Sequence, residues 1–168
     1  MSIIKSFIIL ILVSLFAVSA NSQEVKKVGK FKDWETMVIT EQAGKVCFAQ
    51  SVPVLQSPKS NIREARMFVS FRPGEKVNDE ISVTGGYEFN NKNTITAISG
   101  KSKYKFDIAQ EGFAWITDNK LENKMISTMK KGSRIMITGH NQKGFQTIDH
   151  YSLLGFTKAY NTAKTSCS

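Results

Sequence analysis

The stretch from Thr147 to Cys167 constrains the fold most, because it joins strand periodicity, helix periodicity and one of the two cysteines of the chain. Phe145, Thr147, Asp149 and Tyr151 are spaced two residues apart, which places them on one face of an extended segment. This period of two predicts a β-strand. The strand would be the last one in the chain.

A helix is expected directly after this strand. Beyond Gly155, the residues Phe156, Ala159, Tyr160 and Ala163 recur at positions i, i+3, i+4 and i+7. That spacing gives one apolar face on a helix. A strand, a turn and a short C-terminal helix are therefore predicted for the end of the chain.

The first 20 residues have the features of a secretory signal peptide. Lys5 supplies a positive charge, residues 7–18 are apolar, and Val18-Ser19-Ala20 offers a cleavage site of compact residues. The alternative is an uncleaved anchor, but a membrane-spanning helix needs about 20 apolar residues. We expect cleavage after Ala20, with no transmembrane span in the mature chain.

The chain is basic, with a net charge of +9 that falls to +8 when Lys5 leaves with the signal peptide. A basic protein favours acidic partners, such as anionic lipid or acidic glycan. The alternative is that the lysines, which are scattered through the sequence, serve solubility.

Cys47 and Cys167 are the two cysteines. In an exported protein, two distant cysteines predict a disulfide. A closed loop of this length would stabilise the fold by about 5 kcal/mol in the chain-entropy model. The alternative is a free, reactive thiol at Cys47.

The remaining pattern predicts a mainly β fold, a β-sandwich of about nine short strands with one middle helix and a short C-terminal helix. Residues 21–30 are expected as a flexible lead and residues 31–168 as one domain. Asn119 and Glu122 are spaced for a capping box at the start of the middle helix. The predicted strands are 31–40, 46–54, 67–72, 80–84, 94–99, 103–108, 113–117, 133–138 and 145–151.

Six apolar side chains are predicted to be buried together as the core of this domain. Five are aromatic, and each falls within a predicted strand or helix. They are Trp34, Phe48, Phe106, Trp115, Ile137 and Phe156.

No set of residues predicts catalysis, a cofactor or a metal site. His140 and His150 are the two histidines, and with the cysteines bridged they lack the partners of a Cys/His zinc site. No glycine–x–serine–x–glycine nucleophile turn occurs. Asp118 and Glu122 lie at a helix start, where the helix dipole explains acidic residues.

Lys101, Lys103 and Lys105 form the one patterned surface feature, because they share the solvent-facing side of a predicted strand. They are the candidate contact for an anionic surface, where each lysine contributes about 1 kcal/mol. The alternative is a solvated strand edge that resists pairing with other strands.

In order and spacing, the motifs of the mature chain resemble the invasion associated locus B family of exported bacterial proteins. The motifs are Phe31-x-Asp33-Trp34, Lys45-Val46-Cys47-Phe48 with Pro53, Phe68-Val69-Ser70-x-Arg72-Pro73, Gly86-Tyr87, Ala114-Trp115 with Asp118, Met129-Lys130-Lys131-Gly132, and Thr147-x-Asp149-x-Tyr151-Ser152-Leu153-x-Gly155-Phe156-Thr157-x-Ala159 with Cys167.

The resemblance implies an immunoglobulin-like sandwich in the periplasm or outer membrane of an alphaproteobacterium, and in pathogenic relatives a role in entering host cells. It implies no catalytic residues and no cofactor. We expect a non-catalytic envelope protein whose partner is an envelope or surface component, with an anionic one as candidate, and not nucleic acid. The alternative is a small exported hydrolase acting on an envelope polymer.

Overall fold

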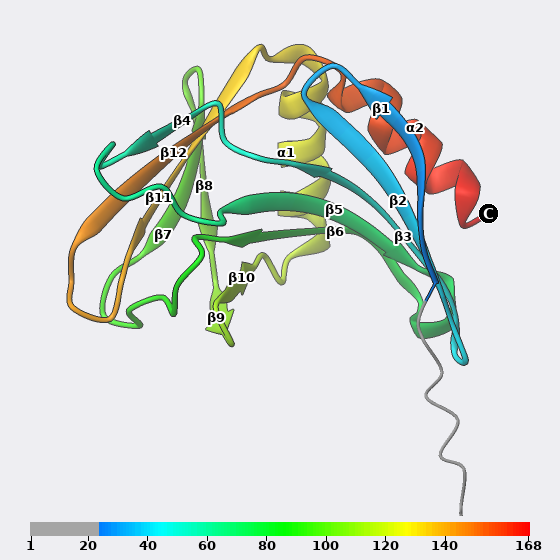
Figure 1. Ribbon diagram of the computed structural model, residues 1–168, viewed down its shortest axis with the longest axis horizontal. Helices are drawn as coiled ribbons and strands as arrows, with labels where there is room; N and C mark the ends of the chain where they lie inside the picture. Colours follow the sequence, from blue (N-terminus) through cyan, green and yellow to red (C-terminus); the bar gives the residue numbers. More distant parts are fainter. Residues whose placement is uncertain (1–23) are drawn as a thin grey trace, which may run out of the picture.

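The computed structural model describes residues 24–168, which form two antiparallel sheets and two α-helices (Figure 1). This confirms the predicted mainly β, sandwich-like fold. The expected signal peptide and residues 21–23 of the expected lead lie outside the described residues. No helix in the described part of the chain is long and apolar enough to cross a membrane.

The larger sheet has seven strands in the order β1-β2-β3-β5-β6-β10-β9. They are β1 (Glu24–Phe31), β2 (Trp34–Glu41), β3 (Gly44–Ser51), β5 (Arg66–Arg72), β6 (Val77–Thr84), β10 (Phe113–Trp115) and β9 (Ile108–Gln110). A short 3-10 helix, Pro73–Glu75, joins β5 to β6.

The smaller sheet has five strands in the order β4-β12-β11-β7-β8. They are β4 (Leu55–Ser57), β12 (Gln146–Ser152), β11 (Arg134–His140), β7 (Ile95–Ser99) and β8 (Ser102–Phe106). Helix α1 (Asn119–Lys131) contacts β6 of the larger sheet and β8 of the smaller one, and so joins the two. Helix α2 (Phe156–Ser166) packs on β1, β2, β3 and β5 of the larger sheet.

The described residues contain twelve strands where about nine were predicted, and β1 is the main addition. Residues 24–30, expected to belong to a flexible lead, pair with β2 in an antiparallel register. Lys27 supports this pairing with an ion pair to Glu35, 2.8 Å between Nζ and Oε1. The side chains of β1 are mostly exposed, so backbone pairing holds this strand and the sequence carries no apolar period to reveal it.

The core lies between the inner faces of the two sheets and the two helices. Trp34, Phe106, Ile137 and Phe156 are buried there, as predicted. The final strand also alternates as predicted, with buried residues at 147, 149 and 151.

The prediction was wrong for Phe48 and Trp115, which are partly exposed. Cys47 and Ala49 on either side of Phe48 are fully buried, as is Ala114 beside Trp115. Side chains alternate across a strand, so both aromatic rings point away from the core. The helices and the smaller sheet cover one face of the larger sheet, and these rings lie on its other face.

The C-terminal helix is fixed to β2 by polar as well as apolar contacts. Trp34 is fully buried, stacks edge-on against Phe156 with 4.8 Å between ring centroids, and donates from Nε1 to the carbonyl of Ser152 at 2.8 Å. Thr36 Oγ1 donates to the Ala159 carbonyl at 2.9 Å. These bonds satisfy the buried polar groups that would otherwise oppose burial.

Gly155 sets the approach of α2 to the β1–β2 turn. Its φ is +89°, a left-handed conformation, and a Cβ placed on it would lie 1.8 Å from the carbonyl oxygen of Phe31. The neighbouring Leu154 carbonyl accepts a hydrogen bond from the Asp33 amide at 3.3 Å. The position therefore requires glycine for both its conformation and its space.

The N-cap of helix α1 lies one residue earlier than predicted. Asp118, not Asn119, is the N-cap, and its Oδ1 accepts from the amides of Lys120 at 2.8 Å and Leu121 at 3.3 Å. The predicted capping box is absent because Glu122 turns inward and is buried.

Candidate functional site

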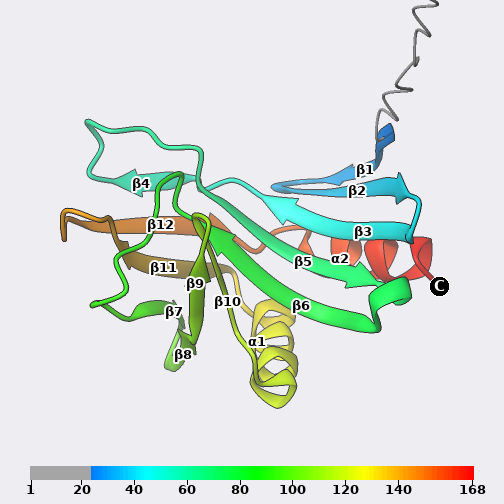
Figure 2. The same cartoon turned by 90° about the horizontal axis from the view of Figure 1, so that it is seen from below.

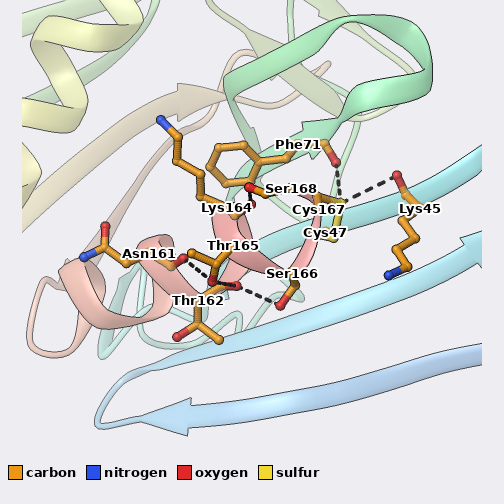
Figure 3. Close-up of a disulfide and its surroundings, with 10 residues drawn as sticks. All are labelled: Lys45, Cys47, Phe71, Asn161, Thr162, Lys164, Thr165, Ser166, Cys167 and Ser168. Atoms are coloured by element: carbon orange, nitrogen blue, oxygen red, sulfur yellow. Dashed lines mark hydrogen bonds between the residues drawn. A yellow bond between two sulfur atoms is a disulfide. The ribbon is translucent and has the colours of Figure 1, made fainter.

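The predicted disulfide is present. Cys47 of β3 and Cys167 at the end of α2 are bonded, with 5.8 Å between their Cα atoms and 120 residues between them in sequence (Figure 3). Cys167 Sγ also lies 3.6 Å from the Phe71 carbonyl oxygen, a contact between β5 and the chain end. The bond ties the C-terminal helix to the middle of the larger sheet.

The three candidate lysines lie together on the smaller sheet. Lys103 and Lys105 are exposed on β8, and Lys101 is exposed in the turn that precedes this strand. Strand β8 is the edge of its sheet. Both a contact for an anionic surface and protection of a strand edge fit this placement.

An ion pair between Arg63 and Asp149 lies inside the molecule, where the loop after β4 meets β12. The side chains are 5% and 4% exposed, and the pair is bidentate, with Nη2 to Oδ1 at 2.7 Å and Nη1 to Oδ2 at 3.0 Å. Arg63 Nη1 also donates to the Gly85 carbonyl at 2.9 Å. This bidentate, hydrogen-bonded geometry is what lets two charges remain buried, although Arg63 Nε is buried without a hydrogen-bond partner among the described residues.

Tyr87 extends this polar cluster. Its hydroxyl is hydrogen-bonded to Thr147 Oγ1, and the Arg63 guanidinium lies 5.6 Å from the centre of its ring. Burial raises the pKa of Tyr87. The cluster links the loop after β6, in the larger sheet, to β12 in the smaller sheet, and so joins the two sheets at this end.

An open hollow lies beside the cluster, at the junction of the two sheets. Arg66 and Phe68 of β5, Phe113 of β10, Tyr87 and Asn141 are among the residues that line it. The hollow combines flat apolar surfaces with a guanidinium, an amide and the carboxylate of Glu64. Such a mixture suits a binding site for a polar molecule with apolar faces.

A second hollow contains two carboxylates, Glu80 of β6 and Glu122 of α1, beside Trp115. Burial raises the pKa of Glu122 to about 7, with the charge of Glu80 adding to the rise. Both groups have structural partners. Glu122 Oε1 accepts from the Ile81 amide at 2.8 Å, and Glu80 accepts two hydrogen bonds from Arg72, at 2.9 and 2.8 Å.

The position of Glu122 follows from the length of β10. Strand β10 ends at Trp115, which pairs with Ser82, so the amide of the preceding Ile81 lies beyond its reach. The Glu122 carboxylate accepts this hydrogen bond in place of a strand. An unpaired buried amide would cost about 1–3 kcal/mol, so this contact stabilises the end of the sheet.

The structure does not bring the histidines together with other ligands. His140 and His150 are half-buried on β11 and β12, and the Nδ1 of each has no hydrogen-bond partner among the described residues. No group of three or more His, Cys, Asp or Glu side chains in residues 24–168 is arranged to hold a metal ion.

Sequence reasoning missed Arg63, although a signal for it existed. Asp149 falls on the same strand face as Tyr151, and that face is the core face. A carboxylate at such a place needs a cation. The chain has four arginines, and the one that supplies this cation depends on the path of an irregular loop. The periodicity of the sequence does not predict that path.

Comparisons with known proteins agree with this architecture. A crystal structure titled invasion associated protein B from Bartonella henselae superposes with a TM-score of 0.57 at 15% identity, covering 82% of this chain and 96% of that one. No curated protein matches the sequence. The invasion associated locus B (IalB) protein family, however, matches residues 34–164, from the start of β2 almost to the end of α2. The chain therefore belongs to the invasion associated locus B family.

Proposed function

We propose that the protein is exported to the bacterial envelope, in the periplasm or at the outer membrane, and acts there as a non-catalytic binding protein. The observation that carries this proposal is the disulfide between Cys47 and Cys167. Such bonds persist in oxidising compartments outside the cytoplasm. The basic signal-like N-terminus and the family membership support the same placement.

The export proposal is tested by intact mass. Protein recovered from the periplasm of the native cell, alkylated without reduction, should lack residues 1–20 and weigh about 2 Da less than the reduced form, because a disulfide removes two hydrogens. Recovery of uncleaved protein with two alkylated thiols from the cytoplasm would contradict it.

The binding proposal is tested by capture from the envelope. Oxidised mature protein, immobilised on resin, should retain a component of its own envelope fraction. A variant that lacks the disulfide and is unfolded under the same conditions is the control, and it should not retain this component. The three lysines give this experiment a sharper form. Changing Lys101, Lys103 and Lys105 to glutamate shifts the local charge by six units at exposed positions. Loss of capture would assign them to the contact, and unchanged capture would assign them to edge protection.

The second candidate is a small hydrolase acting on an envelope polymer, favoured by Glu122 and Glu80 in one hollow. A carboxyl group with a pKa of about 7 is suited to general acid catalysis at neutral pH. The structural partners of both carboxylates argue for an architectural role instead. Release of reducing sugar from envelope glycan by the parent protein, abolished by Glu122→Gln, would establish the hydrolase and refute the binding proposal.

A further inference from the structure

Four aromatic rings form a continuous row across the larger sheet. Phe48 lies on β3, Phe68 on β5, and Phe113 and Trp115 on β10. Successive ring centroids are separated by 5.9, 6.1 and 5.8 Å. All four rings are partly exposed, and we call them the aromatic row. Phe68 and Phe113 line the hollow beside Arg66, and Trp115 lines the hollow that contains Glu80 and Glu122.

The aromatic row lies on the face of the sheet that the core does not use. Met67 and Val69, the neighbours of Phe68, are fully buried on the opposite side. Figure 2 looks onto the open face, with α2 behind the strands. The rings are therefore not needed to close the core, and their clustering on an open face calls for a different explanation.

Polar side chains alternate with the rings on this face. Ser70 is the cross-strand partner of Phe48, Thr84 is the partner of Phe113, and Ser82 pairs with Trp115. Ser70 and Ser82 are buried, and the Thr84 hydroxyl accepts a hydrogen bond from the Gly86 amide at 3.1 Å, so a partner on this face meets the rings and not these hydroxyl groups. A sugar ring suits a row of flat aromatic surfaces, because its C–H face packs on an aromatic ring while its edge carries hydroxyl groups.

Arg66 adds a charge at the side of the row. It lies two residues before Phe68 on the same face of β5 and lines the hollows on both sides of it. It has no ion pair and no hydrogen bond with any described residue, whereas Arg72 on the same face is held by Glu75 and Glu80. A free guanidinium is well suited to bidentate recognition of a carboxylate.

The charged side chains of β1 and β2 near Arg66 also favour a negatively charged ligand. Lys27 and Lys30 share a single carboxylate, that of Glu35, at 2.8 and 3.8 Å. The end of the face near β1, β2 and Arg66 therefore carries an excess of positive charge, whereas the other end, beside Trp115, carries Glu80 and Glu122. An acidic ligand complements this charge.

We propose that the open face of the larger sheet binds an acidic polysaccharide. The sugar rings pack along the aromatic row, and a uronate carboxylate binds Arg66. This inference rests on the proposed binding function and names the chemical class of the envelope component.

Titration of the oxidised mature protein with alginate, a polyuronate, tests the proposal, with neutral dextran as the control polymer. Alginate should bind and dextran should bind much more weakly. Arg66→Gln should weaken alginate binding by about tenfold, the usual effect of losing one charge-assisted hydrogen bond. Phe113→Leu keeps apolar volume but removes a flat ring, and should weaken binding severalfold. Equal binding by these variants and the parent would overturn the proposal.

Tryptophan fluorescence locates the site independently of these variants. The chain has two tryptophans, of which Trp34 is fully buried and Trp115 belongs to the aromatic row. Alginate should alter the emission of the parent and reduce its quenching by acrylamide. In Trp115→Phe, which keeps a ring at this position, alginate should still bind but leave the emission of Trp34 unchanged. A ligand response that persists in this variant would place the polysaccharide elsewhere.

The triple change of Lys101, Lys103 and Lys105 to glutamate is the matched control for general charge. It alters the net charge more than Arg66→Gln, but on the smaller sheet, so alginate binding should fall less than in Arg66→Gln. A larger fall would show that binding follows net charge and would refute the aromatic site. Failure to bind alginate, together with retained capture of an envelope component, would refute this inference while leaving the proposed function intact.

Discussion

The stability of this protein should depend on pH through Glu122. The side chain is 4% exposed, and its burial raises the pKa to about 7 from the usual 4.5, with the charges of Glu80, Asp79 and Asp118 contributing in the same direction. Between these two pH values the folded chain holds a proton that the unfolded chain has released. The free energy of unfolding should therefore fall as pH rises from 4.5 to 7.

The magnitude follows from the shift. Each pKa unit corresponds to about 1.4 kcal/mol, so Glu122 should remove at most about 3 kcal/mol of stability between pH 4.5 and pH 8. Replacing it by glutamine should remove this dependence. The amide oxygen of glutamine can still accept the hydrogen bond from Ile81, so the end of β6 keeps its partner.

The assay is urea unfolding of the oxidised mature protein at a series of pH values, comparing parent and Glu122→Gln. The two should have similar stability at pH 4.5, and the variant should become progressively more stable by pH 8. Subtracting one curve from the other cancels the titration of all groups that do not interact with Glu122. Glu111→Gln, at an exposed position, is the control and should track the parent. A constant difference between parent and Glu122→Gln across this range would refute the argument that burial shifts this carboxyl group.

Four further predictions concern stability, measured as the free energy of unfolding in urea. Gly155→Ala should cost about 3 kcal/mol or more, from its left-handed backbone and its overlap with a carbonyl oxygen; an unchanged midpoint would show that the turn can move. Trp34→Ala should cost about 3–5 kcal/mol, whereas Trp115→Ala, on the open face, should cost only about 1 kcal/mol; equal losses would contradict their assignment to opposite faces. Reduction of the bond to Cys167 should lower stability by up to about 5 kcal/mol for its 120-residue loop, and no change would show that the reduced chain is already constrained. Arg63→Met should cost about 3–5 kcal/mol by leaving a buried carboxylate unpaired, and parental stability would show that water reaches this carboxylate.

The sequence predicted those parts of the fold in which one periodicity dominates. The final strand and the C-terminal helix have clear periods of two and 3.6, and both formed where expected. The disulfide followed from two cysteines and an export signal. Strand β1 was missed because its side chains are mostly exposed and its partner, β2, supplies the pairing energy.

The faces of the central strands could not be assigned from sequence. Strand β3 is apolar on both sides at Cys47, Phe48 and Ala49, so its pattern does not say which side meets the core. The decision depends on where the helices and the second sheet pack, which is set by long-range contacts. For the same reason Trp115 was wrongly predicted to lie in the core, whereas its neighbour Ala114 is the buried residue. The candidate binding face was hidden from the sequence for this reason.

The alternation of β3 also links the disulfide to the aromatic row. Cys47 points inward to its bond with α2, and Phe48, the next residue, points outward as the first ring of the row. Helix α2 supports β3 and β5 from behind, and it is held by this bond, by the contact of Trp34 with Phe156 and by the hydrogen bond from Thr36 to Ala159. Phe48 on β3 and Phe68 on β5 are therefore held in place before any ligand binds, so binding does not have to order them, and the cost of association is reduced. Reduction of the disulfide under conditions in which the protein stays folded should therefore weaken alginate binding, because the sheet beneath the row becomes free to move.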